Sequence, residues 1–109
     1  MQFTTLKDSK SFKNIFDNGV KVVTPFFVLF FLKSISDAPI QIGLVASKKH
    51  FKRAVDRNLC RRRLRASFLK IKDSKGFDCV IVCRKPLLTA QFSELTNHLE
   101  KQITRMLLP

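Results

Sequence analysis

The chain has 109 residues, of which 45% are hydrophobic, and its 21 Lys and Arg against 8 Asp and Glu give a formal net charge of +13. This apolar content is too high for a disordered protein, and only 3 Gly and 4 Pro exclude a collagen-like chain. The longest apolar run, residues 26–32, is far below the roughly 20 residues of a membrane-spanning helix, and no export signal follows Met1. We therefore expect a single cytoplasmic domain over residues 1–109 that makes no membrane contact.

The first predicted element is a short amphipathic helix. Asp8 is a good N-cap residue, and Phe12, Ile15 and Phe16 follow at the i, i+3, i+4 spacing of one helix face. Gly19 ends the pattern. One apolar face therefore carries two phenylalanines toward the rest of the fold.

Three strands are predicted next, at residues 20–24, 26–32 and 40–46. The second is apolar at both odd and even positions, so it is either covered on both faces or leaves aromatic rings open in a cleft. A turn at residues 36–39 separates the second and third strands, and we expect these two strands to form a hairpin.

A long basic helix follows at residues 55–72. At 100° per residue, its apolar stripe consists of Cys60, Leu64, Ser67, Phe68 and Ile71. An adjacent polar stripe consists of Arg57, Arg61 and Arg65, with Asn58 and Arg62 beside it. A fourth strand at 77–83 and a final amphipathic helix at 92–106 complete an α-β-β-β-α-β-α order, which predicts an α/β (α+β) two-layer sandwich with a four-stranded sheet.

The three cysteines are predicted to be reduced core residues. Cys79 and Cys83 lie on the same side of the fourth strand, and Cys60 lies on the apolar stripe of the basic helix. No Cys-x-x-Cys pair occurs, and the two histidines are far apart in the sequence, so we expect no metal site.

The positive charge is concentrated in residues 48–65, which hold nine basic residues and one acid, Asp56. An ordinary solubilising surface or a membrane-surface helix would also be basic. The first usually mixes both signs, however, and the second needs a broad exposed apolar face. Nucleic acid is the favoured partner. Arginine forks bind phosphates and stack on bases, so five arginines on one helix suit a folded RNA, and no helix-turn-helix pattern points to DNA.

The chain has eleven Phe and no Trp or Tyr. Phenylalanine rings are platforms on which single-stranded bases stack, but from the residues alone a plain hydrophobic core is the favoured interpretation of Phe12, Phe16 and Phe30. The acidic residues are scattered, and no nucleophile–histidine grouping or phosphate-binding glycine loop is present, so we expect no catalytic residue.

The segments IGLVASKK at 42–49 and RAVDRNLCRRRLRASF at 53–68 resemble the protein subunit family of bacterial ribonuclease P. The similarity extends to the first helix at 11–19, the aromatic strand at 27–30, and the fourth strand with its exit at 78–86. The resemblance therefore covers nearly the whole chain.

This resemblance implies a sandwich similar to the second domain of ribosomal protein S5, with a left-handed β-α-β crossover through the basic helix. It also implies that an RNA subunit, using Mg²⁺, removes the 5′ leader of precursor tRNA. The protein would bind that catalytic RNA and hold the single-stranded leader in a cleft between the first helix and the sheet. No cofactor bound by the protein itself, and no protein partner, is implied.

By position, the resemblance assigns two groups of site residues. Phe12, Phe16 and Phe30 match the aromatic residues of the leader cleft. The basic RNA-binding motif is matched by Lys48, Lys49, Arg53, Arg57, Asn58, Arg61, Arg62 and Arg65.

One position departs from the family pattern. The family motif reads Arg-Asn-Arg, whereas this chain has Arg57-Asn58-Leu59. Leu59 is predicted to face away from the core, and Arg63, about one turn later on the same side, is predicted to supply the missing charge. Two other functions stay open, namely a ribosomal or assembly protein that binds structured RNA without a leader cleft, and a protein-only nuclease.

Overall fold

The computed structural model describes residues 1–34 and 37–108. In chain order the elements are β1 (Phe3–Thr5), α1 (Ser9–Asn18), β2 (Val20–Val23), β3 (Phe27–Lys33), β4 (Ile40–Val45), α2 (Ala54–Lys70), β5 (Phe77–Cys83), the short 3-10 helix η1 (Lys85–Leu88) and α3 (Phe92–Leu107). All seven predicted elements are present, with boundaries shifted by at most two residues. No helix among the described residues is long and apolar enough to span a membrane.

The sheet has five strands in the order β1-β4-β5-β3-β2, one more than the sequence predicts. The additional strand, β1, pairs in parallel with β4, and Thr4 lies opposite Gln41. Because β1 has only three residues, it is too short to show the alternation by which a strand is recognised in a sequence.

The predicted hairpin between the second and third strands is wrong. β5 lies between β3 and β4, antiparallel to β3 and parallel to β4. β5 takes this central position because both of its faces are apolar: Cys79 and Ile81 are buried on one face and Val80 on the other. The hairpin forms instead between β2 and β3, where Thr24 Oγ1 donates to the carbonyl of Phe27. The predicted turn at 36–39 begins outside the described residues.

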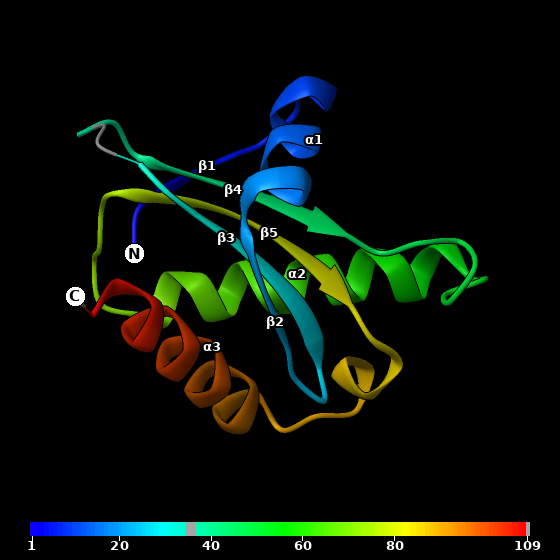
Figure 1. Cartoon of the computed structure of the whole chain (residues 1–109). Helices are drawn as coiled ribbons and strands as arrows, with labels where there is room; N and C mark the ends of the chain where they lie inside the picture. Colours follow the sequence, from blue (N-terminus) through cyan, green and yellow to red (C-terminus); the bar gives the residue numbers. More distant parts are fainter. Residues whose placement is uncertain (35–36, 109) are drawn as a thin grey trace.

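β4, α2 and β5 form a β-α-β unit with two parallel neighbouring strands. In Figure 1 both strands run from left to right, β5 lies below β4, and α2 passes behind the sheet. This arrangement makes the crossover left-handed, whereas nearly all such crossovers are right-handed.

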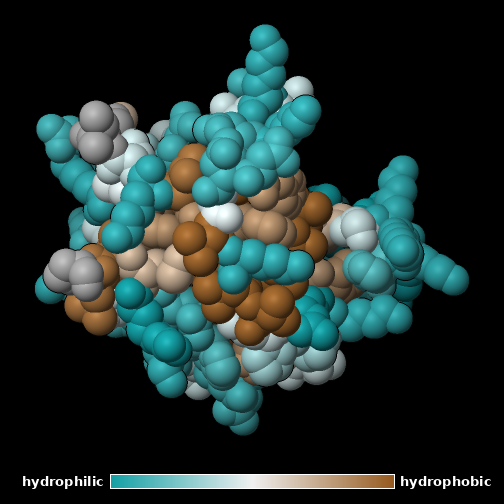
Figure 2. Space-filling view, in the orientation of Figure 1, coloured by the Kyte–Doolittle hydropathy of each residue, from teal (hydrophilic) through white to brown (hydrophobic). Residues whose placement is uncertain are grey.

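The two faces of the sheet are covered to different extents. α2 and α3 pack on one face, and the core beneath them contains the fully buried Phe27, Leu29 and Phe31 of β3. Of the helices among the described residues, only α1 packs on the other face, over a smaller cluster built on Ile15 and Val80. Figure 2 views the molecule from this second side and shows apolar surface gathered beneath α1. The alternation of β3 thus divides its aromatic residues between a closed and an open face.

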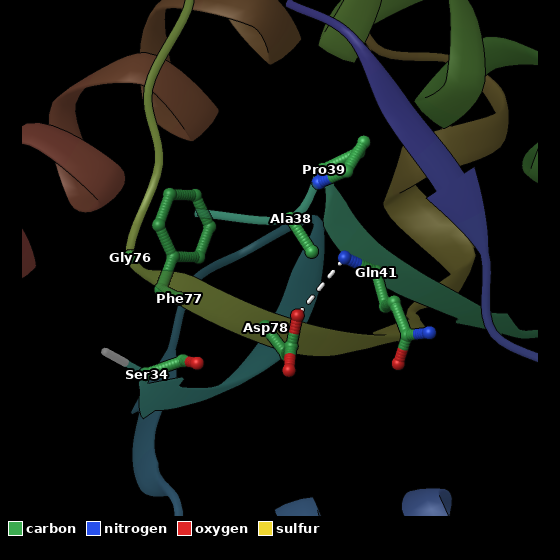
Figure 3. A pocket seen from close by; sticks show the side chains of 7 residues that line it. All are labelled: Ser34, Ala38, Pro39, Gln41, Gly76, Phe77 and Asp78. Carbon is green, nitrogen blue, oxygen red and sulfur yellow. Dashed lines mark hydrogen bonds between the residues drawn. The ribbon is translucent and has the colours of Figure 1, made fainter. Parts of the chain in front are cut away.

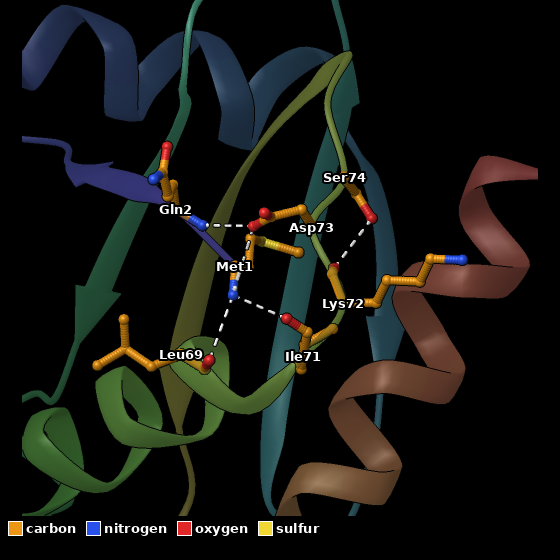
Figure 4. A network of polar contacts seen from close by, with 7 residues as sticks. All are labelled: Met1, Gln2, Leu69, Ile71, Lys72, Asp73 and Ser74. Atoms are coloured by element: carbon orange, nitrogen blue, oxygen red, sulfur yellow. Dashed lines mark hydrogen bonds and ion pairs between the residues drawn. The ribbon is translucent and has the colours of Figure 1, made fainter.

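A polar network joins the start of the chain to the end of α2 (Figure 4). The Met1 amino group donates to the carbonyls of Leu69, at 3.3 Å, and Ile71, at 2.7 Å, and lies 3.6 Å from an Asp73 carboxylate oxygen. The backbone N–H of Gln2 donates to the same oxygen. These contacts satisfy carbonyls that the helix leaves unpaired at its C-terminal end. They therefore hold the edge strand β1 beside α2.

Candidate nucleic-acid interface

α1 presents its aromatic residues to the open face of the sheet. Asp8 caps the helix, accepting from the backbone N–H of Lys10 at 3.2 Å. The helix ends where the N–H of Gly19 donates to the carbonyl of Ile15 at 2.8 Å. A Cβ at Gly19 would lie only 2.5 Å from that carbonyl oxygen, so glycine allows the chain to turn directly from α1 into β2. Both ends of α1 are thus determined by local sequence.

The three phenylalanines predicted for the cleft lie together. The Phe16 ring meets the Phe30 ring edge-on, with centroids 4.8 Å apart, and the Phe12 ring lies 6.5 Å from Phe16. Phe12 and Phe30 are half-buried, and Phe16 is 38% exposed. Gly43 of β4 lies directly below Phe12, and a Cβ there would overlap the Phe12 ring. The cluster therefore packs on the sheet and keeps an aromatic edge open to solvent.

The same face of the sheet continues away from α1 into a hollow of about 390 Å³. Val28 and Val82, which are opposite each other in the β3–β5 ladder, belong to its lining. Residues 48–53, which join β4 to α2 and are called the basic turn, contribute His50 to its lining. The end of β5 and the residues after it contribute the rest: Cys83, Arg84, Lys85 and Pro86. The resemblance does not point to the two valines. Their alternation with the core residues of β3 and β5 was the signal that places them on the open face.

A second hollow, of about 490 Å³, shares His50 and Lys85 with the first. The basic turn contributes most of its lining, and Asp56 is the one acid in it. The remaining lining residues are Lys49, Phe51, Lys52, Arg53 and Leu88. Lys48 is exposed on the same turn. The open face therefore leads from phenylalanine, through valine, to a strongly positive end.

The arginines of α2 are not equivalent in the structure. Arg57 donates to the carbonyls of Phe51 and Lys52, at 2.7 and 3.1 Å. Arg61 donates to Asn58 Oδ1 at 3.3 Å and reaches the carbonyl of Ala46 at 3.5 Å. Each guanidinium has five N–H donors, so both keep donors for a ligand. These contacts also hold the basic turn against the helix.

Arg62 and Arg65 are exposed, and neither guanidinium forms a hydrogen bond or ion pair with any described residue. Together with four neighbours they line a hollow of about 490 Å³ on the outer face of α2. Those neighbours are Val55, Asn58, Leu59 and Arg61. This surface has free cationic donors on an ordered helix, which suits the binding of phosphate groups.

Arg63 has a different environment from the one predicted. Its guanidinium donates to the carbonyl of Leu88 at 2.8 Å and to the carbonyl of Ala90. It therefore ties α2 to the end of η1 and to the residues that follow it. That Arg63 supplies the charge of the missing family arginine stays a prediction. Leu59 is half-buried and faces the outer hollow, as its position on the helix predicts.

The cysteines are core residues, as predicted. All three are buried, and the thiols of Cys60 in α2 and Cys83 in β5 are close enough for each to affect the pKa of the other. Burial raises the pKa of Cys60 and Cys79, and it raises the pKa of Cys83 to about 12. The thiols are thus neutral and unreactive at physiological pH. Among the described residues, no three His, Cys, Asp or Glu side chains cluster in a way that could hold a metal ion.

A separate small hollow, of about 190 Å³, lies at the opposite end of β4 and β5 (Figure 3). Here the Asp78 carboxylate accepts from the backbone N–H of Gln41 at 2.9 Å and joins the two strands. Gly76, at φ +87°, makes the turn into β5 in a conformation that favours glycine. None of the predicted site residues lines this hollow, and its hydrogen bond between Gln41 and Asp78 connects β4 to β5.

The comparisons with known proteins agree with this geometry. A family model described as Ribonuclease P matches residues 1–107. The ribonuclease P protein component of a Nitratiruptor species is 36% identical over 103 residues, which cover 94% of this chain and 91% of the relative. That of Pseudomonas syringae pv. tomato is 37% identical over 99 residues, covering 89% and 74%.

Two solved structures have the same fold. The RNase P protein from Thermotoga maritima is 29% identical with a TM-score of 0.77, covering 93% of this chain and 96% of that one. The Staphylococcus aureus RNase P protein has a TM-score of 0.79 at 22% identity, covering 97% of both chains. The resemblance in the basic helix, the left-handed crossover and these matches agree, and the chain belongs to the ribonuclease P protein family.

Proposed function

We propose that this chain is the protein subunit of ribonuclease P and assists the RNA-catalysed removal of the 5′ leader from precursor tRNA. The observation that carries the proposal is the open face of the sheet, where half-exposed phenylalanines lead into a positive end. A single strand of varied sequence needs aromatic platforms for its bases and cations for its phosphates, and this face offers both in one line.

In this proposal Phe12, Phe16 and Phe30 stack on leader bases. Base stacking on an aromatic side chain contributes about 1–3 kcal/mol per base and tolerates any sequence, which suits leaders that differ between tRNAs. Val28 and Val82 form the apolar floor beyond the rings. The leader then passes to the basic residues shared by the two adjoining hollows.

The catalytic RNA is proposed to bind the outer face of α2 and the basic turn. Arg62 and Arg65 extend into solvent and bind phosphates directly. Arg57 and Arg61 both hold the basic turn in place and keep donors for RNA. Lys48, Lys49 and Arg53 add positive charge at the start of the helix.

We assign the hydrolysis itself, and the Mg²⁺ that it uses, to the RNA subunit. The acidic side chains of this chain are dispersed, and its buried thiols are neutral. The contribution of the protein is therefore electrostatic and positional: it neutralises phosphates and orders the leader. No cofactor of its own and no further protein partner enter the proposal.

Reconstitution tests the proposed function. The purified chain is mixed with bacterial ribonuclease P RNA and a leader-bearing precursor tRNA, at a Mg²⁺ concentration too low for the RNA alone. Leader removal only when protein and RNA are both present is the expected result. Cleavage by the chain alone would contradict the assignment of catalysis to RNA. No cleavage, together with tight binding to other structured RNA, would favour a ribosomal or assembly protein.

The salt dependence of leader binding gives a second check. A single strand that contacts Z cations loses affinity with a slope of about −0.7Z in a plot of log K against log salt. Leader affinity that stays flat between low and moderate salt would contradict the positive end of the cleft. Lys101 is exposed on α3 and lines neither of these two hollows, so Lys101→Ala is the control for any variant that removes one exposed charge from them.

A further inference from the structure

The outer face of α2 contains an apolar surface that phosphate binding alone does not explain. Val55 is 56% exposed and Leu59 is half-buried, and the two lie one helical turn apart in the lining of the outer hollow. Arg62 and Arg65 stand beside them with free guanidinium groups. The hollow thus has an apolar floor and a cationic rim.

Arg63, which is predicted to supply the charge missing at Leu59, does not line this hollow. Arg63, four residues beyond Leu59, is held by the carbonyls of Leu88 and Ala90. Covering apolar surface is favourable by about 25 cal/mol per Å², but only when the covering group is itself weakly hydrated. A phosphate is strongly hydrated, whereas the face of a nucleobase is not. The floor therefore fits a base better than it fits the RNA backbone.

The rim determines which weakly hydrated partner fits. A second copy of this chain, docked by two-fold symmetry, would bring the arginines of both rims together. Each copy already carries a net charge of +13, so such a contact is electrostatically unfavourable. An RNA partner supplies anionic phosphates for the rim and a flat base for the floor in the same nucleotide.

We propose that this hollow seats an unpaired nucleobase of the RNA bound by α2. Val55 and Leu59 contact the face of the base, and Arg62 and Arg65 bind the phosphates on either side of it. Arg62 adjoins the floor and can also stack on the exposed side of the base. This inference rests on the proposed function, since it requires that α2 faces the ribonuclease P RNA.

Salt titration separates the floor from the rim. The affinity of the chain for ribonuclease P RNA is measured over a series of salt concentrations. Leu59→Ala is expected to lower the affinity roughly fivefold, corresponding to about 1 kcal/mol, and to leave the salt slope unchanged, because the lost contact is apolar. Arg62→Ala is expected to reduce the slope by about 0.7 to 0.9, the value of one phosphate contact.

Two further variants control for folding and position. Leu69→Ala removes an equally large side chain, 62% exposed, from the same helix but outside the hollow, and is expected to leave RNA affinity unchanged. Val55→Ser changes the second apolar residue of the hollow, whose side chain is 56% exposed and contributes little to the core. Like Leu59→Ala, it is expected to lower RNA affinity and leave the salt slope unchanged. Thermal unfolding of each variant verifies that the fold is retained.

A chemical probe supplies a direct readout. Saturating wild-type chain is expected to protect one unpaired base of the RNA from a base-directed alkylating reagent, and saturating Leu59→Ala is expected to lose that protection. Unchanged affinity in Leu59→Ala and Val55→Ser would overturn the inference. Tighter binding with a steeper slope in Leu59→Arg would also overturn it, since the floor would then face a phosphate.

Other outcomes distinguish the inference from the function on which it rests. If Arg62→Ala and Arg65→Ala together leave RNA affinity and slope unchanged, α2 does not face RNA and the proposed function fails at this surface. If Leu59→Ala instead dissociates a dimer seen by light scattering and leaves RNA affinity unchanged, the floor is a contact between two copies of the chain.

Discussion

The two faces of the sheet use the same residue type for different purposes. Phe30 and Phe31 are neighbours in β3, yet Phe31 is 1% exposed and stacked on Phe77 at 4.6 Å, while Phe30 is half-buried beside Phe16. The difference in exposure arises from the length of the helices that pack on each face. α2 and α3 have 17 and 16 residues, whereas α1 has 10 and spans only about 15 Å. A phenylalanine is therefore fully buried or partly exposed according to how far the packed helix extends.

The largest expected effect comes from the closed face. Phe31→Ala should lower the free energy of unfolding by about 3–5 kcal/mol, because it leaves a cavity among fully buried neighbours. Phe30→Ala, one residue earlier on the open face, should cost clearly less. Equilibrium unfolding in urea measures both. Equal losses would mean that the open face is packed as tightly as the closed one.

Arg63→Ala should have the next largest effect, again on the closed side. Two carbonyls, those of Leu88 and Ala90, lose their donor, and we expect the free energy of unfolding to fall by about 2 kcal/mol. RNA affinity should fall no more than in Lys101→Ala. Arg62→Ala should show the reverse pattern, with RNA affinity reduced and stability retained. A strong loss of RNA affinity in Arg63→Ala would contradict this prediction and show that Arg63 contributes to RNA binding.

Phe16→Ala sharpens the comparison on the open face. Loss of one stacking platform should weaken the binding of leader-bearing precursor tRNA about tenfold, within the 1–3 kcal/mol typical of a stacked base. Binding of mature tRNA, which has no leader, should be unaffected. Fluorescence or filter binding with the two tRNAs side by side measures the difference. An equal loss for both tRNAs would make Phe16 a structural residue like Phe31.

The smallest effect is expected from the thiols of the closed face. Burial raises the pKa of Cys83 from 9.0 to about 12, so above pH 9 the unfolded chain releases this proton while the folded chain retains it. Stability should therefore be unaffected below pH 9 and should fall as the pH rises beyond it. Tm measured between pH 8 and 10.5 tests this decline. Cys83→Ala should make the decline shallower without abolishing it, because burial also raises the pKa of Cys60 and Cys79. An identical decline in that variant would show that Cys83 does not contribute to it.

Much of the local structure follows from sequence alone. The cap of α1, the apolar stripe of α2 and the bounds of β5 are set by residues that lie within a few positions of one another. The basic segment and its resemblance also predict the family. Helix caps, 3.6-residue periodicity and strand alternation act over one or two turns, so they leave a visible pattern in the chain.

Tertiary structure alone decided which elements meet. β1 is too short to be recognised until it pairs with β4, and β5 separates two strands that are consecutive in the sequence. Arg62 and Arg63 are adjacent and identical in type, yet one extends into solvent and the other binds carbonyls 25 and 27 residues away. The physical reason is that these contacts join distant segments. A free donor and a donor bound to a distant carbonyl look the same in the sequence, and only the packing of residues 88–90 against α2 distinguishes them.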